Sequence, residues 1–209
     1  MTSNASLPLL PLATMAAGLD LMLLTHQTEF LKTTNTGVLV TALSGDNRIQ
    51  VRRPLWSRVA PDQQLLAAIA SQPSFLLYPG PQAQLLDVQK WQLYWQQQLQ
   101  QNAAETHEQQ AESSNIGPPG PRLQLIVLDA TWQLARKMYN QSAYLKQLPA
   151  ISLDSTEKSV YRLRRNQQDM GWCTAESVCM LLSALGYLKA AAELQQLFLA
   201  FNQPEKAEK

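Results

Sequence analysis

The sequence predicts an α/β fold, in which helices pack on both faces of a largely parallel sheet. Residues 19–25 (LDLMLLT) and 123–128 (LQLIVL) are apolar runs with the length of a buried strand. Segments of helical composition, at 62–70 and 131–139, alternate with strand-like segments along the chain. Strands that alternate with helices in this way form parallel sheets with both faces covered.

Local patterns define the elements expected in the first half of the chain. The first apolar run leads into a polar loop that ends in the turn-forming residues Asn35, Thr36 and Gly37. Alternating residues predict a strand at 48–53, helix propensity predicts a helix at 62–70, and Pro79-Gly80 ends the strand at 75–78. In order, we expect a strand at 19–25, a loop at 26–37, a strand at 48–53, a helix at 62–70 and a strand at 75–78.

The second half begins with a segment of unusual composition. Glutamine dominates residues 89–110, with aromatic residues and leucines between, which predicts a helix with a narrow apolar stripe. The three prolines of 111–121 (AESSNIGPPGP) exclude regular structure. We interpret 89–121 as a peripheral helical insertion and linker. Beyond it we expect a strand at 123–128, a helix at 131–139, a strand at 148–153, and one or two helices at 174–201 with a break near Gly186.

The composition suits one globular domain, because 209 residues with 45% hydrophobic content can bury a single core. The formal charge of +1 means that contact with nucleic acid would depend on local basic clusters. The two cysteines, Cys173 and Cys179, form no grouping with zinc spacing, so we expect no metal and a reducing, cytoplasmic location. No apolar run approaches the roughly 20 residues of a membrane span, and nothing indicates an obligate protein partner.

Residues 125–138 (LIVLDATWQLARKM) resemble the signature of the DTW-domain family. Other blocks resemble the family in the same order along the chain. They are HQTEFLKTTNTG at 26–37, LYPG at 77–80, LPAISL at 148–153, YRLR at 161–164 and CTAE at 173–176. The resemblance covers about residues 21–186 and implies a single DTW domain over 1–209, with the insertion at 89–121.

The resemblance also implies an activity and a more specific fold. Family members known as enzymes transfer the 3-amino-3-carboxypropyl group of S-adenosylmethionine to N3 of a uridine in tRNA, releasing methylthioadenosine. Similarity to the SPOUT class implies a SPOUT-like domain whose C-terminal knot binds the cofactor. A SPOUT-like RNA methyltransferase and a non-catalytic RNA-binding module are the alternatives. Many relatives begin with a cysteine-rich knuckle, which this sequence lacks, so the resemblance gives no support for a metal.

Three residues of the signature are the candidate catalytic residues: Asp129, Thr131 and Trp132. Asp129 follows a buried strand, where α/β sheets bind ligands, and could accept the uridine N3 proton or orient the reactants. Alternatively, Asp129 only caps the helix that follows. Thr131 is a second cap or a cofactor contact. Trp132 is an aromatic wall for a base or a sulfonium, or a core residue.

The candidate cofactor-binding residues lie in two turns and at one helix start. The turns follow strands, and the helix start offers backbone N–H groups to an anion, although ordinary chain reversal and helix initiation explain these residues equally well. The candidates are Thr36, Tyr78, Pro79, Gly80, Thr174, Ala175 and Glu176. His26 follows a strand, but a solitary histidine is more often a structural hydrogen-bonding residue than a catalyst.

Three basic clusters are the candidate tRNA-binding residues. Guanidinium groups pair with phosphates, and Tyr161 could stack on an extruded base, although single surface arginines are usually only solvated. The candidates are Arg52, Arg53, Arg136, Lys137, Tyr161, Arg162 and Arg164. If 161–165 is a strand, Arg162 and Arg164 point to the same side.

Overall fold

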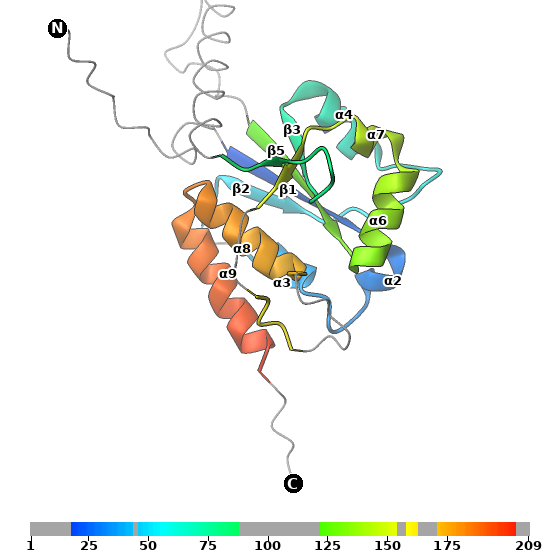
Figure 1. Ribbon diagram of the computed structural model, residues 1–209. Helices are drawn as coiled ribbons and strands as arrows, with labels where there is room; N and C mark the ends of the chain where they lie inside the picture. The colour runs from blue at the N-terminus through cyan, green and yellow to red at the C-terminus, as the bar shows by residue number, and fades with distance from the viewer. Residues whose placement is uncertain (1–17, 44–45, 88–121, 154–157, 163–170, 204–209) are drawn as a thin grey trace, which may run out of the picture.

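Six parallel strands form the centre of the molecule, in the order β2-β1-β5-β3-β6-β4 (Figure 1). The computed structural model describes residues 18–43, 46–87, 122–153, 158–162 and 171–203. The strands are β1 (Gly18–Thr25), β2 (Ile49–Arg52), β3 (Ser74–Leu77), β4 (Gln84–Leu85), β5 (Arg122–Asp129) and β6 (Ala150–Ser152). The helices are α2 (Gln27–Phe30), α3 (Gly37–Thr41), α4 (Gln63–Ser71), α6 (Trp132–Gln141), α7 (Ala143–Lys146), α8 (Thr174–Ala184) and α9 (Leu188–Phe201).

The two eight-residue strands β1 and β5 lie side by side in the middle of the sheet. They pair in register from Gly18 with Arg122 to Thr25 with Asp129. Both strands are buried along nearly their whole length, because the apolar runs 21–24 and 125–128 are covered on both faces of the sheet. Their shared register brings the two carboxyl ends, Thr25 and Asp129, to the same point on the edge of the sheet.

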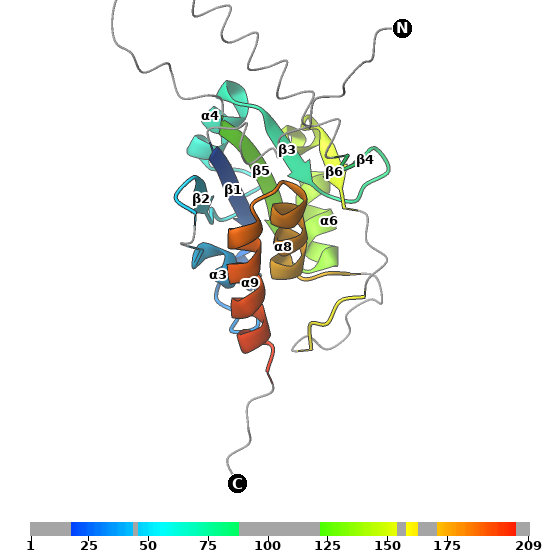
Figure 2. The same cartoon turned by 90° about the vertical axis from the view of Figure 1, so that its left-hand side faces the viewer.

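Helices α3, α8 and α9 cover one face of the sheet. Alternate strand residues such as Leu21 and Leu125 pack there with Leu181 and Leu194, all four of them fully buried. Figure 2 shows α8 and α9 in front of the strands, with α6 behind them. The intervening strand residues, such as Ile126, point to the other face and pack with α4, α6 and α7. Because successive side chains of a strand point to opposite faces, a single strand contributes residues to both hydrophobic cores.

Most elements expected from the sequence are present, and the α/β class is confirmed. The chain between α8 and α9 turns at Gly186, whose φ of 87° is a left-handed conformation that favours glycine. The loop expected at 26–37 contains the short helix α2. Helices α3 and α7 and strand β4 were not expected; two to five residues are too few for a periodic signal.

Two expectations lie partly or wholly outside the described residues. The insertion at 89–121 is one of them. The C-terminal knot is the other, because residues 154–157 and 163–170, between β6 and α8, are not described. The knot therefore stays a prediction. In the described part of the chain, no helix has the length and apolar character needed to cross a membrane.

Replacing Leu125 by alanine should destabilise the fold strongly, because this side chain is fully buried in the central strand. Loss of a buried leucine costs about 2–5 kcal/mol. Leu188→Ala is the matched control, since Leu188 is 67% exposed and begins α9. Urea unfolding of both variants measures the difference. Equal effects of the two substitutions would contradict the described core.

Candidate functional site

A buried carboxylate lies at the carboxyl edge of the sheet. Asp129 has no exposed surface, and four side chains donate hydrogen bonds to its two oxygens. Oδ1 accepts from Asn35 Nδ2 at 3.0 Å and from Thr174 Oγ1 at 2.9 Å. Oδ2 accepts from Thr25 Oγ1 at 2.9 Å and from the Arg53 guanidinium at 3.1 Å. We call these five residues the Asp129 network.

Arg53 balances the buried charge. Its guanidinium forms an ion pair with Asp129, and its Nη2 also donates to Asn35 Oδ1 at 3.0 Å. The same group donates to the carbonyl of Phe30 and lies 4.5 Å from the centre of the Phe30 ring. A planar guanidinium with five donors suits such a site better than a lysine would. The arginine thereby fixes both the carboxylate and the loop that follows β1.

Gly37 is required by the same network. Its backbone N–H donates to Asn35 Oδ1 at 2.8 Å. A Cβ atom at Gly37 would lie 2.5 Å from Asp129 Oδ2, closer than side-chain carbons approach an oxygen. Because Asp129 is held by its partners, it has no room to move away. The Asn-Thr-Gly sequence is therefore explained by hydrogen bonding at Asn35 and by close approach at Gly37.

The start of α8 docks on the preceding residue of that loop. Thr36 Oγ1 accepts from the backbone N–H of Ala175 at 3.2 Å, and both residues are buried. Glu176 Oε2 accepts from the N–H of Cys173 at 2.8 Å. At least two of the first donors of this helix are thus already used within the protein. This leaves less of the helix start open to an anion than the sequence suggested.

Glu176 also holds a short segment, residues 159–161, over the start of α8. Its carboxylate accepts from the Ser159 hydroxyl at 2.7 Å and from the Val160 N–H at 2.8 Å. The Tyr161 hydroxyl donates to the carbonyl of Thr34, and the tyrosine is only 6% exposed. Tyr161 is therefore part of the core beside α9.

Cys173 lies beside this carboxylate. Burial, and secondarily the charge of Glu176, raise the pKa of the Cys173 thiol to about 12. It is therefore a neutral thiol at physiological pH and a poor nucleophile.

Within the described ranges, no group of three or more His, Cys, Asp or Glu side chains is placed to hold a metal ion.

Three aromatic rings stack where β3 and β5 end. Tyr78 stacks on Tyr139 with a centroid distance of 4.4 Å and on Trp132 with 5.5 Å. Tyr78 is buried, and this burial raises the pKa of its hydroxyl, while Arg136 opposes the shift. Trp132 is 43% exposed. The outer tryptophan is thus supported from beneath and open to a ligand above.

Thr131, not Asp129, caps α6. Its hydroxyl accepts from the backbone N–H of Leu134, at 3.4 Å. The Asp129 oxygens are directed instead to the Asp129 network. The interpretation of Asp129 as a helix cap is therefore wrong: the carboxylate points away from the helix that follows it.

The DTW-domain family model matches residues 8–205, nearly the whole chain. The chain belongs to the DTW-domain family. This is the family of the tRNA-uridine aminocarboxypropyltransferases, and it is associated with enzymes that modify tRNA. No solved structure matches the chain.

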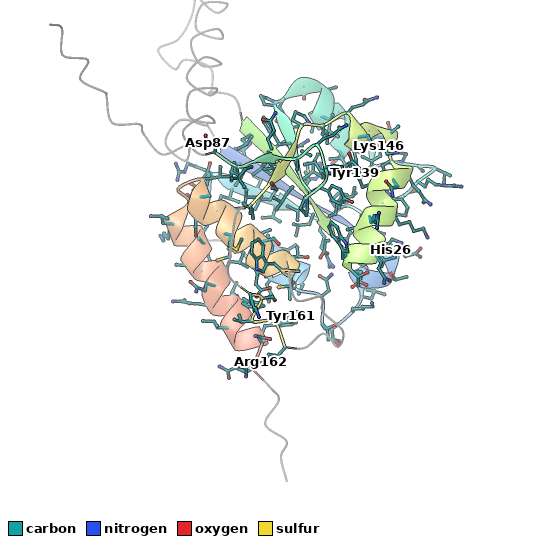
Figure 3. All side chains as sticks on the ribbon, in the orientation of Figure 1. His26, Asp87, Tyr139, Lys146, Tyr161 and Arg162 are labelled. Atoms are coloured by element: carbon teal, nitrogen blue, oxygen red, sulfur yellow. The ribbon has the colours of Figure 1, made fainter. Side chains whose placement is uncertain are left out.

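The basic residues expected to bind tRNA have different environments in this DTW domain. Arg53, whose side chain is 13% exposed, is held in the Asp129 network, and Tyr161 is buried beside α9. Arg136 and Lys137 are exposed on α6. Figure 3 shows Arg162 near the carboxyl end of α9, away from α6. Arg52, 3.8 Å from Asp62, is partly exposed, and Arg164 lies outside the described residues, so a strand-like pairing of Arg162 with Arg164 stays a prediction.

Sequence reasoning placed no functional role on Thr25 and misassigned the environment of Arg53. A signal was present for Thr25, because it ends a buried strand paired in register with the strand of Asp129. Asn35 belongs to a turn that was expected to line the cofactor pocket, but its hydrogen bond to Asp129 was not predicted. Nothing in the sequence distinguishes Arg53, which pairs with Asp129, from the neighbouring and more exposed Arg52.

Asp129→Asn should destabilise the DTW domain, because the amide NH2 would face donors and Arg53 would lose its buried counter-charge. Removing one partner of a buried ion pair costs about 3–5 kcal/mol, which lowers Tm by at least about 6 °C. Asp62→Asn is the control, since Asp62 forms a surface pair and caps α4, a role that asparagine also performs. Calorimetry of both variants gives the comparison. A Tm for Asp129→Asn within a degree of the control would remove the network from the determinants of stability.

Proposed function

We propose that this protein transfers the 3-amino-3-carboxypropyl group from S-adenosylmethionine to N3 of a uridine in tRNA. Family membership supports tRNA modification. The observation that supports this site is the convergence of the DTW signature, the Asn-Thr-Gly turn and the start of α8 on one buried carboxylate. That point is the carboxyl edge of a parallel sheet, where α/β proteins bind ligands.

Asp129 acts in this proposal as a positioning residue and not as the base. Both of its oxygens already accept hydrogen bonds, and it has no exposed surface from which to take a proton. Its role is to fix the loop that follows β1 and the start of α8 relative to β5. The N3 proton then leaves to solvent as the new N–C bond forms and the donor C–S bond breaks. Precise placement of the reactants is itself a large source of rate enhancement.

Trp132 supplies an aromatic wall for the positively charged sulfonium of the donor. Aromatic faces attract cations, and a ring fixed by stacking needs no reordering on binding. Tyr78 and Tyr139 hold Trp132 in place, and Pro79 and Gly80 follow directly at the end of β3. Of the other cofactor candidates, Thr36, Thr174, Ala175 and Glu176 shape the site through contacts within the protein.

Basic side chains around this edge are proposed to hold the tRNA backbone. Arg136 and Lys137 are exposed on α6, Arg136 near Tyr78 and Lys137 near His26. Arg52 and Arg162 lie on other elements and are further candidates. Arg53 and Tyr161 are instead assigned to organisation of the site, since both are held within the protein.

Incubation of the purified protein with S-adenosylmethionine and unmodified tRNA should yield methylthioadenosine and 3-(3-amino-3-carboxypropyl)uridine in equal amounts. Mass spectrometry of nucleosides and of the small-molecule product measures both. S-adenosylhomocysteine with a methylated base would show a methyltransferase instead. Binding of tRNA without formation of either product would indicate a non-catalytic RNA-binding module.

Trp132→Ala should weaken S-adenosylmethionine binding by roughly 2–30-fold, from the magnitude of a cation–π contact. Trp132→Phe should retain most of the affinity, because it keeps an aromatic face over Tyr78. Leu31→Ala, at an 89% exposed position, is a control for surface truncation. Isothermal titration calorimetry measures the affinities. Unchanged affinity in Trp132→Ala would place the donor elsewhere.

A further inference from the structure

A second aromatic pair, formed by His26 and Trp56, lies on the same sheet face as the Tyr78 stack. The two rings have a centroid distance of 5.5 Å and an interplanar angle of 22°. Trp56 Nε1 donates to the hydroxyl of Ser142, at the end of α6, at 2.9 Å. Trp56 also packs against the core on this face, while both rings of the pair stay partly exposed. The pair is thus a rigid aromatic surface at the edge of the site.

The two aromatic groups lie on opposite flanks of α6. Trp132 and Tyr139 are seven residues apart, so they lie on the same flank of the helix, toward Tyr78. Lys137 is about 140–160° around the helix from those residues. It lies toward His26, whose pKa it helps to lower. Arg136 is correspondingly the cation that acts on Tyr78. Each of the two aromatic groups therefore lies near one exposed cation, Arg136 or Lys137. These two cations occupy adjacent positions of α6.

The surface around α6 is basic although the whole protein is nearly neutral. From Ala130 to Leu153 the sequence contains no Asp or Glu, but it contains Arg136, Lys137 and Lys146. Figure 3 shows His26 and Lys146 on the side of the molecule that carries α6 and α7. A concentration of cations beside exposed aromatic rings fits a polyanion with stacking bases.

We propose that His26, Trp56 and Lys137 form a stacking site for an unpaired nucleotide of the RNA, beside the nucleotide that is modified. This inference rests on the proposed function, since it gives the RNA a second point of attachment across α6 from Trp132. The base stacks on the imidazole, which the indole supports from its other side, and Lys137 contacts a flanking phosphate. A site on each flank would splay two nucleotides apart and present one of them to the donor.

The electrostatic surroundings of His26 fit a neutral stacking ring. Burial and then Lys137 lower the pKa of His26, and Lys32 acts in the same direction, while Glu29 opposes it. The imidazole is therefore largely uncharged at neutral pH, and the cationic contact is left to Lys137. Its Nδ1 is occupied, because it accepts from the Thr28 N–H at 3.2 Å and caps α2.

Two substitutions at His26 separate stacking from capping. His26→Phe keeps an aromatic ring beside Trp56 but loses the cap, whereas His26→Asn keeps a capping side chain and loses the ring. If a base stacks here, His26→Asn weakens tRNA binding at least about five-fold, from the magnitude of one base–aromatic stack, and His26→Phe does not. If the residue is only a cap, His26→Phe lowers Tm while both variants bind tRNA like the wild type, which overturns the proposal.

A substitution at Lys137 tests the proposal independently of the stability of the His26 variants, because the Lys137 side chain is exposed. Lys137→Gln should make the log–log dependence of tRNA affinity on salt shallower by about one unit. Lys189→Gln on α9 is the matched control, an exposed lysine in the layer on the other face of the sheet. A slope unchanged in Lys137→Gln would overturn the phosphate contact.

These measurements separate the inference from the proposed function. They use fluorescence anisotropy with labelled, unmodified tRNA, and S-adenosylmethionine affinity is followed in parallel by calorimetry. Wild-type protein that forms the aminocarboxypropyl product, with His26→Asn and Lys137→Gln unchanged in tRNA binding, would sink the inference alone. Wild-type protein that neither binds nor modifies tRNA would sink both. Selective loss of tRNA binding with donor affinity retained supports the proposed site.

Discussion

Burial of one carboxylate constrains the whole carboxyl edge of the sheet. A buried charge is stable only when hydrogen bonds and a counter-charge replace the water it has lost. Asp129 obtains these partners from β1, from the loop after it, from the residue that follows β2 and from the start of α8. None of these segments is adjacent to β5 in the sequence. The electrostatic demand of a single side chain therefore determines how four separate segments meet.

The sheet makes this meeting possible. Parallel pairing of β1 with β5 in register places Thr25 opposite Asp129, so the first hydrogen bond needs no special loop. The apolar layers on both faces then fix the heights of α3, α6 and α8 above the strands. Hydrophobic burial thus sets the position of the strands, and the polar contacts of the site form at the ends of these strands. The aromatic groups on either flank of α6 use the same scaffold, because their rings rest on the core that holds the helix.

The sequence predicts the layers better than the site. Runs such as 123–128 carry an unambiguous apolar signal, and Gly186 marks the break between the last helices, as the structure confirms. Short elements such as α7 are set by tertiary packing and leave no periodic pattern. In the site, the family motifs located Asp129 and Trp132, but not what each side chain contacts. The contact of Arg53 with Asp129, which its neighbour Arg52 does not make, joins residues 76 apart in the chain, and local patterns do not encode it.

The sequence separations within the Asp129 network bear on how the site comes into being during folding. Its partners lie 104, 94, 76 and 45 residues from Asp129 along the chain. Closing such long loops carries an entropic cost before any contact compensates for it, and topologies rich in distant contacts fold slowly. The hydrogen bond from Thr174 can form only when the start of α8 is docked beside Asp129 and Thr36. A nascent chain that stops short of α8 would contain the complete DTW signature and yet lack the Thr174 hydroxyl that completes the Asp129 network.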